Sequence, residues 1–390
     1  MELHPFLERH MAPNPDLWYV LSAFGDFPSM RVGHSCSYVP GPEGHGGRVY
    51  VIGGANPSGT FAETHFLDLD TFTWDSVDSV RLKPRYEHAA FIPRSKPSKV
   101  YIFGGADQGG NNNDIQVYDT VSQTWSAVSV GGTSPSARTY HTTACLGDQL
   151  IVYSGGQSGS DPVGDRQVHC FDAAQHEWSN LKVQGDSPKP RHGHLVIAVG
   201  TKILIHGGMS GTTFYDDLYV LDVSKRMWST IKQKKVFPSA RAAHGAFVLD
   251  TDVYVFGGMN RDGALHDMYK LDTTSMKWSR VSFEGPPPAS RLDFACCVVR
   301  LSVPRSPPAT NEEINNSSEQ AIEILGQQFR MGSAGSAHSV GSAGSTRTDC
   351  KLVDVALVMG GMDTNGEIFD DCLVYLLKDH ADQDGACGYD

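Results

Sequence analysis

Val49-Tyr50-Val51-Ile52-Gly53-Gly54 is a run of four apolar residues followed by two glycines. The same pattern returns five times, in copies that end at Gly104-Gly105, Gly155-Gly156, Gly207-Gly208, Gly257-Gly258 and Gly360-Gly361. The first five glycine pairs lie 51, 51, 52 and 50 residues apart, and the sixth lies 103 residues beyond the fifth. A period of about 50 residues, written in β-branched and aromatic residues, indicates a radially repeated sheet protein.

Each copy carries further landmarks in the same order. An Asp stands six residues before a Trp in five copies, as at Asp119 and Trp125. Most of these Trp residues are followed thirteen residues later by an Arg, but Trp74 reaches Arg85 in eleven. The Arg opens an Arg-x-x-His unit in five repeats, and Phe294 replaces the histidine in the sixth. These landmarks keep their register over the chain and define one repeated unit.

The unit predicts four strands. A small-residue run after Arg-x-x-His forms the innermost strand, and the apolar run before Gly-Gly forms a second strand that is buried on both faces. Residues 218–222 exemplify the third strand, and the Trp opens the fourth. Glycine fits where two blades and a loop converge because it has no Cβ, and Trp supplies the surface that one blade lays on the next. The pattern resembles the kelch repeat over roughly residues 18–377.

The two ends of the chain carry incomplete repeats. Trp18-Tyr19-Val20-Leu21 is a fourth strand without predecessors, whereas the C-terminal repeat supplies three strands and no Trp. Pairing of these ends in one sheet would protect the exposed edges of the ring. The sequence therefore predicts an all-β, six-bladed kelch β-propeller over residues 16–377, closed by an N-terminal strand completing the C-terminal blade. Residues 1–15 are predicted to be a disordered N-terminus and residues 378–390 a flexible tail.

One segment breaks the period. Residues 302–350 separate the first two strands of the sixth repeat and are rich in Pro, Gly, Ser and Ala. Such a composition buries too little apolar area to offset chain entropy, so a disordered low-complexity insert is predicted. Within it, residues 318–329 form a candidate helix capped by Ser318, and a partner-docking role for this helix is the alternative.

Charge and composition exclude several functions. A net charge of −12 argues against a nucleic-acid partner, which needs a basic stripe. The N-terminus shows no signal-peptide pattern, and no run approaches eighteen apolar residues. The eight cysteines have no C-x-x-C spacing and are interpreted as reduced packing thiols. We therefore expect a cytoplasmic protein, which we take to be a monomer.

No set of residues predicts catalysis. Adjacent copies of the repeat histidine lie too far apart to share one ion at ligand distances of about 2 Å. The acids before the third strand recur once per repeat, with Gln167 in the third, so repetition explains them better than chemistry. Glu367 and Asp371 match part of an iron motif known from kelch relatives, but Tyr375 replaces its histidine. We expect no catalytic residue, no metal and no cofactor, and a metal-dependent kelch enzyme is the disfavoured alternative.

A binding surface remains. Because successive strands alternate in direction, the loops after Gly-Gly and the loops before each Arg emerge on one face. That face presents the candidate partner-binding residues Arg31, Arg85, Arg138, Arg191, Arg241, Arg291, Asn56, Asp107, Asn260 and Asp363. An Arg ring would form a positive mouth suited to carboxylate recognition. In the alternative, each Arg holds two blades together by pairing with a repeat acid, and Arg suits both roles equally.

Several stretches of the sequence resemble one group of proteins within the kelch family in particular. Arg31-Val32-Gly33-His34 and Phe214-Tyr215-Asp216-Asp217-Leu218 resemble the kelch-repeat effectors of Rab GTPases, and the resemblance spans essentially the whole chain. It implies a non-enzymatic cytoplasmic protein that is recruited peripherally to endosomal membranes. It further implies binding to the GTP form of a Rab GTPase and vesicle docking in transport to the trans-Golgi network. A kelch adaptor or scaffold for another partner is the alternative.

Overall fold

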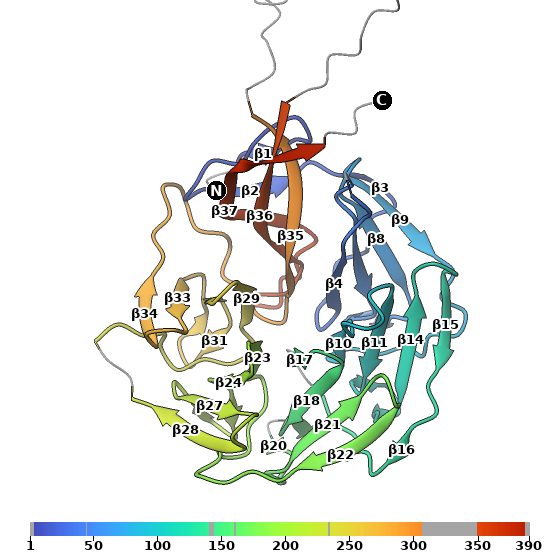
Figure 1. Cartoon of the computed structure of the whole chain (residues 1–390), viewed down its shortest axis with the longest axis vertical. Helices are drawn as coiled ribbons and strands as arrows, with labels where there is room; N and C mark the ends of the chain where they lie inside the picture. Colours follow the sequence, from blue (N-terminus) through green and yellow to red (C-terminus); the bar gives the residue numbers. More distant parts are fainter. Residues whose placement is uncertain are drawn as a thin grey trace, which may run out of the picture.

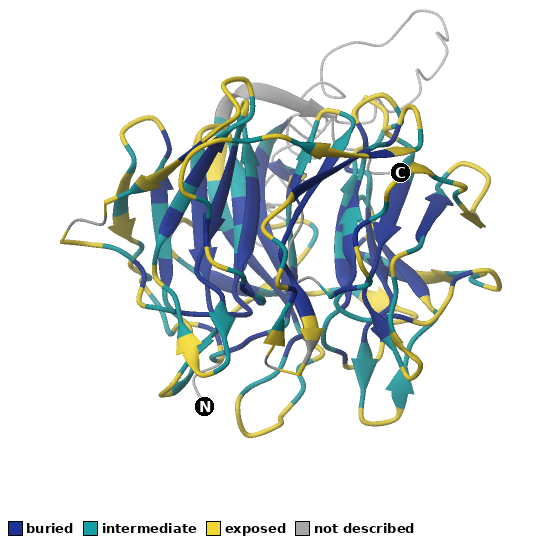
Figure 2. Ribbon diagram, turned by 90° about the horizontal axis from the view of Figure 1, so that it is seen from below, coloured by how far each residue is buried: buried dark blue, intermediate teal, exposed yellow. Residues whose placement is uncertain are grey.

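The computed structural model describes residues 4–43, 45–139, 144–159, 161–232, 235–305 and 349–386. In these ranges the main strands form six sheets of four or five strands, arranged radially around one axis (Figure 1). Strands in the middle of the molecule are buried, and the loops at its two ends are exposed (Figure 2). The predicted all-β, six-bladed propeller is confirmed.

Blades 2, 4 and 5 are antiparallel sheets of four strands. From the axis outward, blade 2 consists of β10 (Ala89–Phe91), β11 (Lys99–Phe103), β14 (Ile115–Asp119) and β15 (Thr124–Ala127). Blade 4 consists of β23 (Leu195–Val199), β24 (Lys202–His206), β27 (Leu218–Asp222) and β28 (Met227–Ile231). Blade 5 consists of β29 (Gly245–Leu249), β30 (Asp252–Phe256), β33 (Met268–Asp272) and β34 (Lys277–Arg280).

Blades 1 and 3 carry a fifth strand on their outer edge. Blade 1 contains β4 (Ser35–Val39), β5 (Arg48–Ile52), β8 (Thr64–Asp68), β9 (Thr73–Val77) and β3 (Phe24–Gly25). Blade 3 contains β17 (Ala144–Leu146), β18 (Gln149–Tyr153), β21 (Val168–Asp172), β22 (Glu177–Leu181) and β16 (Gly131–Gly132). The extra strands, β3 and β16, pair in parallel with the outer strand of their blade.

Blade 6 joins the two ends of the chain. It contains β35 (Ala295–Pro304), β36 (Asp349–Met359), β37 (Cys372–Ala386), β2 (Trp18–Leu21) and β1 (Phe6–Leu7). β2 pairs antiparallel with β37 and sets Trp18 opposite Tyr375. In Figure 1 the N-terminal strand β2 lies beside β37 of this blade. The predicted closure of the ring is confirmed.

The strands of blade 6 reach into segments that were predicted to be irregular. β1 falls within residues 1–15, where Leu7 is fully buried against the core of blades 6 and 1. β37 continues to Ala386, so residues 378–386 are strand and not a flexible tail. Residues 302–304 and 349–350 of the predicted insert belong to β35 and β36, because these two strands continue to pair with each other there. The candidate helix at 318–329 lies outside the described residues.

Tryptophans fill the seams between blades, as predicted. Trp125 of blade 2 is 2% exposed and packs with Tyr50 and Ile52 of blade 1. Its indole Nε1 donates a hydrogen bond of 3.0 Å to Thr64 Oγ1 on β8, so the polar atom of the ring is also satisfied in the seam. Burial of such rings between neighbouring sheets is a main source of propeller stability.

The register of the third repeat differs from the predicted one. In other blades the repeat Arg donates to the carbonyl of the first glycine, as Arg85 does to Gly104. In blade 3, Arg138 donates instead to the carbonyl of Ser154. The equivalent of the glycine pair is therefore Ser154-Gly155. Ser154 adopts a φ of 56°, and its hydroxyl accepts the Arg191 N–H at 2.8 Å. This hydrogen bond compensates for a left-handed conformation that serine rarely adopts.

The described cysteines are not all free thiols. Cys350, at the start of β36, is disulfide-bonded, so the prediction that all eight cysteines are reduced is wrong there. Among the cysteines that the structure describes, the free thiols are Cys36, Cys145, Cys170, Cys296, Cys297 and Cys372.

Candidate partner-binding face

Hairpins and linkers share one end of the propeller. The hairpins are β6 (Ala55–Asn56) with β7 (Gly59–Thr60), β12 (Ala106–Asp107) with β13 (Gly110–Asn111), β19 (Gly156–Ser158) with β20 (Asp161–Pro162), β25 (Met209–Ser210) with β26 (Thr213–Phe214), and β31 (Met259–Asn260) with β32 (Gly263–Ala264). The residue after each repeat Arg bridges to the residue after the glycine pair, as Val32 does to Ala55. The two kinds of loop therefore meet, and we call this end, with the loop 363–367 of blade 6, the hairpin face.

The six repeat arginines are buried under this face. None is more than 2% exposed. In blade 4, Arg191 Nη1 donates to Gly207 O at 2.8 Å, and Nη2 donates to Asp217 Oδ2 at 3.1 Å. Every blade repeats this arrangement, and the ion pairs are Arg31–Glu63, Arg85–Asp114, Arg138–Asp165, Arg191–Asp217, Arg241–Asp267 and Arg291–Asp371.

The backbone of the same arginines bonds to the preceding blade. The Gly54 N–H of blade 1 donates to the carbonyl of Arg85 at 2.8 Å, and the Gly361 N–H of blade 6 donates to that of Arg31 at 3.2 Å. Aromatic rings cover some of the guanidinium groups, as where the centroid of the Tyr215 ring lies 4.2 Å from Arg191 Cζ. Each Arg thus joins two blades, which favours the structural alternative over direct recognition of partner carboxylates.

The acids of these pairs are the groups that reach the surface. Their side chains are 47% exposed at Glu63 and between 19% and 30% exposed at the five aspartates. Burial tends to raise the pKa of Asp114, but the hydrogen bonds and charge of Arg85 outweigh it and hold that pKa below its ordinary value. The carboxylates of these pairs therefore reach the surface, whereas the guanidinium groups of the predicted positive ring lie beneath it.

The acid of the third blade was assigned to the wrong position by the fixed spacing. Asp165, two residues before Gln167, accepts from Arg138 Nη2 at 2.8 Å. The sequence does favour Asp165 over Gln167 as the partner of the Arg, because a neutral amide cannot neutralise a buried guanidinium.

The four other candidate residues shape the turns of the hairpin face. Each accepts a backbone N–H two residues further on, at 2.6 Å for Asp107 and 2.8 Å for Asn56, Asn260 and Asp363. This is the Asx-turn geometry that Asn and Asp favour. All four are half-buried, so they fix the shape of the hairpin tips while keeping part of their surface exposed.

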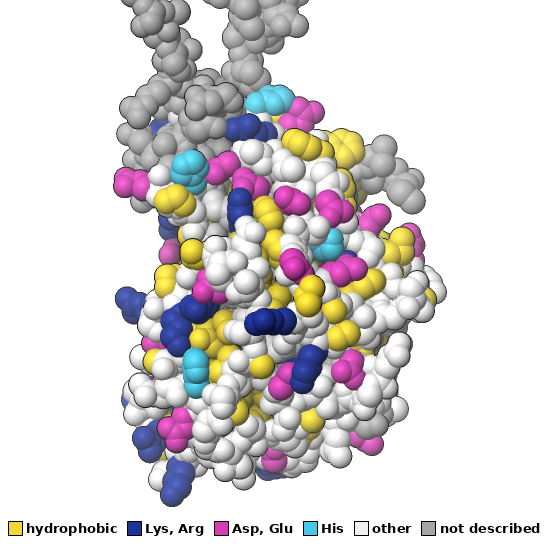
Figure 3. All heavy atoms as spheres, turned by 90° about the vertical axis from the view of Figure 1, so that its right-hand side faces the viewer, with side chains coloured by type: hydrophobic (Ala, Val, Ile, Leu, Met, Phe, Trp, Pro, Cys, Tyr) yellow, Lys and Arg dark blue, Asp and Glu magenta, His cyan; other side chains and the backbone are white. Residues whose placement is uncertain are grey.

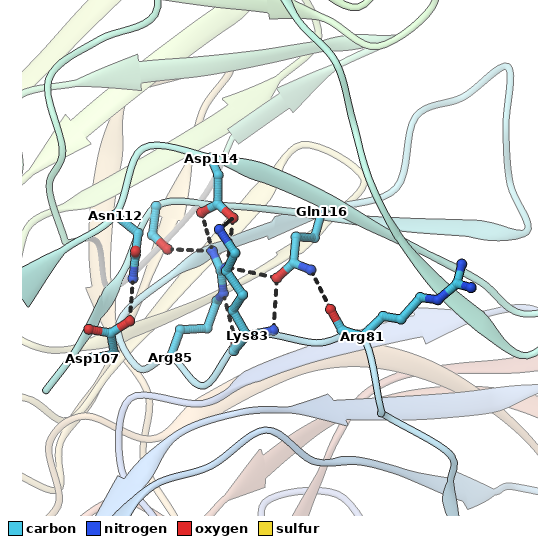
Figure 4. A network of polar contacts seen from close by, with 8 residues as sticks. Arg81, Lys83, Arg85, Asp107, Asn112, Asp114 and Gln116 are labelled. Atoms are coloured by element: carbon cyan, nitrogen blue, oxygen red, sulfur yellow. Dashed lines mark hydrogen bonds and ion pairs between the residues drawn. The ribbon is translucent and has the colours of Figure 1, made fainter. Parts of the chain in front are cut away.

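Blade 2 contains a polar network that the sequence did not reveal (Figure 4). Gln116, on β14, is 2% exposed. Its Oε1 accepts from the Lys83 N–H at 3.0 Å and from Arg85 Nη2 at 2.7 Å, and its Nε2 donates to Arg81 O at 2.8 Å. Gln116 thereby fastens residues 81–85 of the short connection between Trp74 and Arg85 to the third strand.

The repeat histidines pack between blades. A Cβ on Gly360 would lie 3.1 Å from His34 Cε1, and a Cβ on Gly257 would lie 3.0 Å from the equivalent Phe294 Cε1. His194 Nε2 lies 3.0 Å from Tyr153 O of the preceding blade. These positions serve packing, whereas His141 lies outside the described residues. In the described ranges, no three His, Cys, Asp or Glu side chains are grouped so that they could hold a metal ion.

The free energy of unfolding is expected to decrease as the pH falls from about 6.5 to about 3. Burial, followed by repulsion from nearby arginines, lowers the pKa of His34, His88 and His206 from 6.5 to about 3. Between these values the unfolded chain binds more protons than the folded one, so stability is present above pH 6.5 and is lost below it. Each histidine contributes a slope of up to about 1.4 kcal/mol per pH unit.

Urea denaturation at pH 7.5 and pH 5.0 measures this loss. The matched variant is His34→Phe, which copies the Phe294 packing of blade 6 and removes one titrating group. The variant is expected to reduce the slope of the free energy of unfolding against pH by the contribution of one histidine. An unchanged slope in His34→Phe would show that His34 does not contribute.

Comparison with known proteins decides the family. The model for the KLHDC2/KLHL20/DRC7 Kelch-repeats domain matches residues 10–159, 44–258 and 155–303. The chain belongs to the kelch-repeat family. It is 50% identical over 380 residues to the human "Rab9 effector protein with kelch motifs", covering 96% of this chain and 99% of that protein. It is 46% identical over 377 residues to the mouse protein of the same name, covering 96% and 97%. The resemblance to kelch-repeat Rab effectors is confirmed, and it supports a protein-interaction role.

Proposed function

We propose that this chain is a non-enzymatic effector that binds a Rab GTPase in its GTP form. On this proposal it acts at endosomal membranes and promotes vesicle docking in endosome-to-Golgi transport. The observation that carries the proposal is the likeness, over 96% of the chain, to proteins named Rab9 effectors. In the described ranges no helix is long and apolar enough to cross a bilayer. Recruitment by the membrane-bound GTPase would account for a peripheral association.

We infer that the GTPase contacts the hairpin face. Loops that stand on a rigid scaffold are the usual place for binding residues. The buried Arg–acid pairs hold the hairpins to the blades, and Asn56, Asp107, Asn260 and Asp363 set the shape of their tips. In this interpretation the arginines position the surface, and exposed hairpin residues and the repeat acids contact the partner.

Binding to Rab9 loaded with a non-hydrolysable GTP analogue is expected to exceed binding to the GDP form at least tenfold. The γ-phosphate orders the switch loops of a GTPase, so an effector that reads those loops discriminates the two states. Titration of the full chain with both forms by calorimetry measures the ratio, and a panel of other Rab GTPases tests selectivity. Equal affinity for the two forms, or no binding, would overturn the effector proposal.

Charge reversal on the hairpin face tests the docking surface in the same assay. Asp262→Lys and Glu367→Lys change exposed side chains of this face without touching an Arg–acid pair. The matched control is Glu43→Lys, an exposed acid in the turn between β4 and β5 at the other end of the molecule. We expect weaker GTPase binding from the first two variants only. Loss from Glu43→Lys alone would move the site to the opposite face while leaving the effector proposal intact.

A further inference from the structure

The connections between blades also protect sheet edges. We use linker for the segment that runs from the outer strand of one blade to the repeat Arg of the next. In four blades an N–H of the incoming linker donates to a carbonyl beside the outer strand. The donor and acceptor residues are Phe24 and Phe72 in blade 1 (3.1 Å), Gly131 and His176 in blade 3 (2.9 Å), Gln184 and Arg226 in blade 4 (2.9 Å), and Glu284 and Asp16 in blade 6 (2.8 Å).

These contacts share one register. Every acceptor stands two residues before the Trp of its blade, and its φ lies between 53° and 61°. In blades 1, 3 and 4 the linker runs parallel to the outer strand. In blade 4 the Trp228 N–H returns a hydrogen bond of 2.8 Å to Gln184 O. The outer edge beside the Trp of these blades therefore offers a backbone carbonyl that accepts a hydrogen bond from one extended segment.

Blade 2 has the same edge but no described residue on it. Gln123 takes the acceptor position with a φ of 55°, yet the linker from Trp74 to Arg85 is two residues shorter than the others. Gln116 holds that linker against β14, away from β15. In the described part of the chain, the outward backbone groups of Gln123 and Trp125 consequently have no hydrogen-bond partner.

The surroundings of this edge are open. Gln123, Thr124, Ser126 and Ala127 are exposed, and Val121 beside them is 81% exposed. In Figure 1, β15 lies at the rim of the molecule, and Figure 3 shows the side of the molecule on which it lies, with apolar and charged side chains interspersed. In blade 5 the equivalent linker positions, 233 and 234, lie outside the described residues.

The covered edges show what kind of segment fits. The residue that follows the donor is glycine in all four linkers, and its φ is positive at Gly25, Gly132 and Gly185. A Cβ at these positions would lie 2.2, 2.0 and 2.6 Å from the carbonyl oxygen of the blade's Trp. Such distances exclude any other residue without movement of the backbone. An occupant of the β15 edge therefore needs a glycine opposite Trp125.

We propose that the outer edge of β15 is a docking site for an extended, glycine-containing segment of a partner protein. The segment adds to blade 2 parallel to β15, with its backbone N–H on Gln123 O and its backbone O on the Trp125 N–H. This is strand addition, in which main-chain hydrogen bonds provide affinity and local side-chain fit provides specificity. The site lies on the rim and is independent of the GTPase contact proposed above.

A peptide copied from this chain tests the proposal. The probe is fluorescent Lys-Val-Gln-Gly-Asp-Ser-Pro, the sequence of residues 182–188 that covers the edge of blade 4. We expect saturable binding to the full chain at concentrations up to about 1 mM. The control peptide has valine in place of its glycine and should bind at least tenfold more weakly. Equal binding of the two peptides, or none by the glycine peptide, would overturn the proposal.

Two protein variants locate the site. Ala127 lies two residues after Trp125, so its N–H points to the same edge, and Ala127→Pro blocks that edge while the ladder to β14 is kept. Ala127→Ser is the matched control and should bind normally. Replacing residues 78–84 by the nine residues 182–190 gives blade 2 a linker of the usual length, which should cover the edge and abolish peptide binding. If calorimetry shows that both blocking variants are folded and they still bind the peptide normally, the assignment of the site to the β15 edge is wrong.

Hydrogen exchange gives a readout that does not depend on the probe's affinity. The Trp125 amide is expected to exchange faster than the Trp74, Trp178 and Trp228 amides, and to become protected when the peptide is added. Equal protection of all four in the free, monomeric protein would mean that the edge is already covered, and would overturn the proposal. If sedimentation shows that two copies pair through β15, the occupant of this edge is a second copy of the chain and not a partner protein.

Discussion

A chain that lacks residues 1–24 is expected to melt at least about 10 °C below the full chain, or not to fold. The deletion removes β1, β2 and Phe24 of β3, and it leaves blade 6 with three strands. Trp18 is 1% exposed, and its ring centroid lies 5.1 Å from those of Phe256 and Tyr375. Loss of such a side chain costs about 3–5 kcal/mol before the β2–β37 ladder is counted. Against a total of about 5–15 kcal/mol, the loss is severe.

Calorimetry of the truncated chain measures this effect, and two point variants separate its parts. Trp18→Ala keeps the strand and removes only the packing, so it should fall between the full and truncated chains. Phe6→Ser changes a side chain of β1 that is 62% exposed and should be nearly neutral. Adding residues 1–24 as a separate peptide should raise the melting temperature again. A truncated chain that melts within a degree or two of the full chain would disprove closure by the N-terminal strand.

Arg191→Ala is expected to lower the free energy of unfolding by about 3–5 kcal/mol. The guanidinium is fully buried and donates to Gly207 O and Asp217, while the Arg191 carbonyl accepts from the Gly155 N–H of blade 3. Alanine leaves the Gly207 carbonyl and the Asp217 carboxylate without this partner at the seam between two blades. The cost of such unpaired groups exceeds the net value of the pair itself.

Urea denaturation measures the change, with three comparisons. Arg191→Lys should recover little stability, because an ammonium cannot reproduce the planar fork. Lys189→Ala, two residues away and exposed, should be neutral. The double change Arg191→Met with Asp217→Leu removes both charges and should recover part of the loss. If Arg191→Ala unfolded at the normal urea concentration but bound the GTPase more weakly, the recognition role would be restored.

The sequence by itself determined the architecture. Strand patterning, Gly-Gly and Trp are local signals, and repetition at a nearly constant period allowed only a ring of similar sheets. The closure was also readable, because a fourth strand at Trp18 and three strands after Phe294 complete one blade. The location of the hairpin face followed from strand direction alone.

The roles of the candidate residues were decided by the tertiary structure. An Arg beside a channel is compatible with a binding mouth and with a blade joint, because the sequence does not state which groups are buried. Packing placed all six guanidinium groups inside and left the acids at the surface. The long strands of blade 6 were likewise unpredictable, since their partners are each other and not a repeated pattern.

The edge of β15 shows both sources of information together. The eleven-residue spacing from Trp74 to Arg85 is visible in the sequence, where it indicates only a shorter loop. Its consequence appears once the linkers of blades 1, 3 and 4 are seen to pair with the outer strands of their blades. Hydrogen bonding between segments far apart in the chain depends on where the fold brings them, so only the tertiary structure showed that the shorter loop leaves the outer edge of β15 without a partner in the described residues.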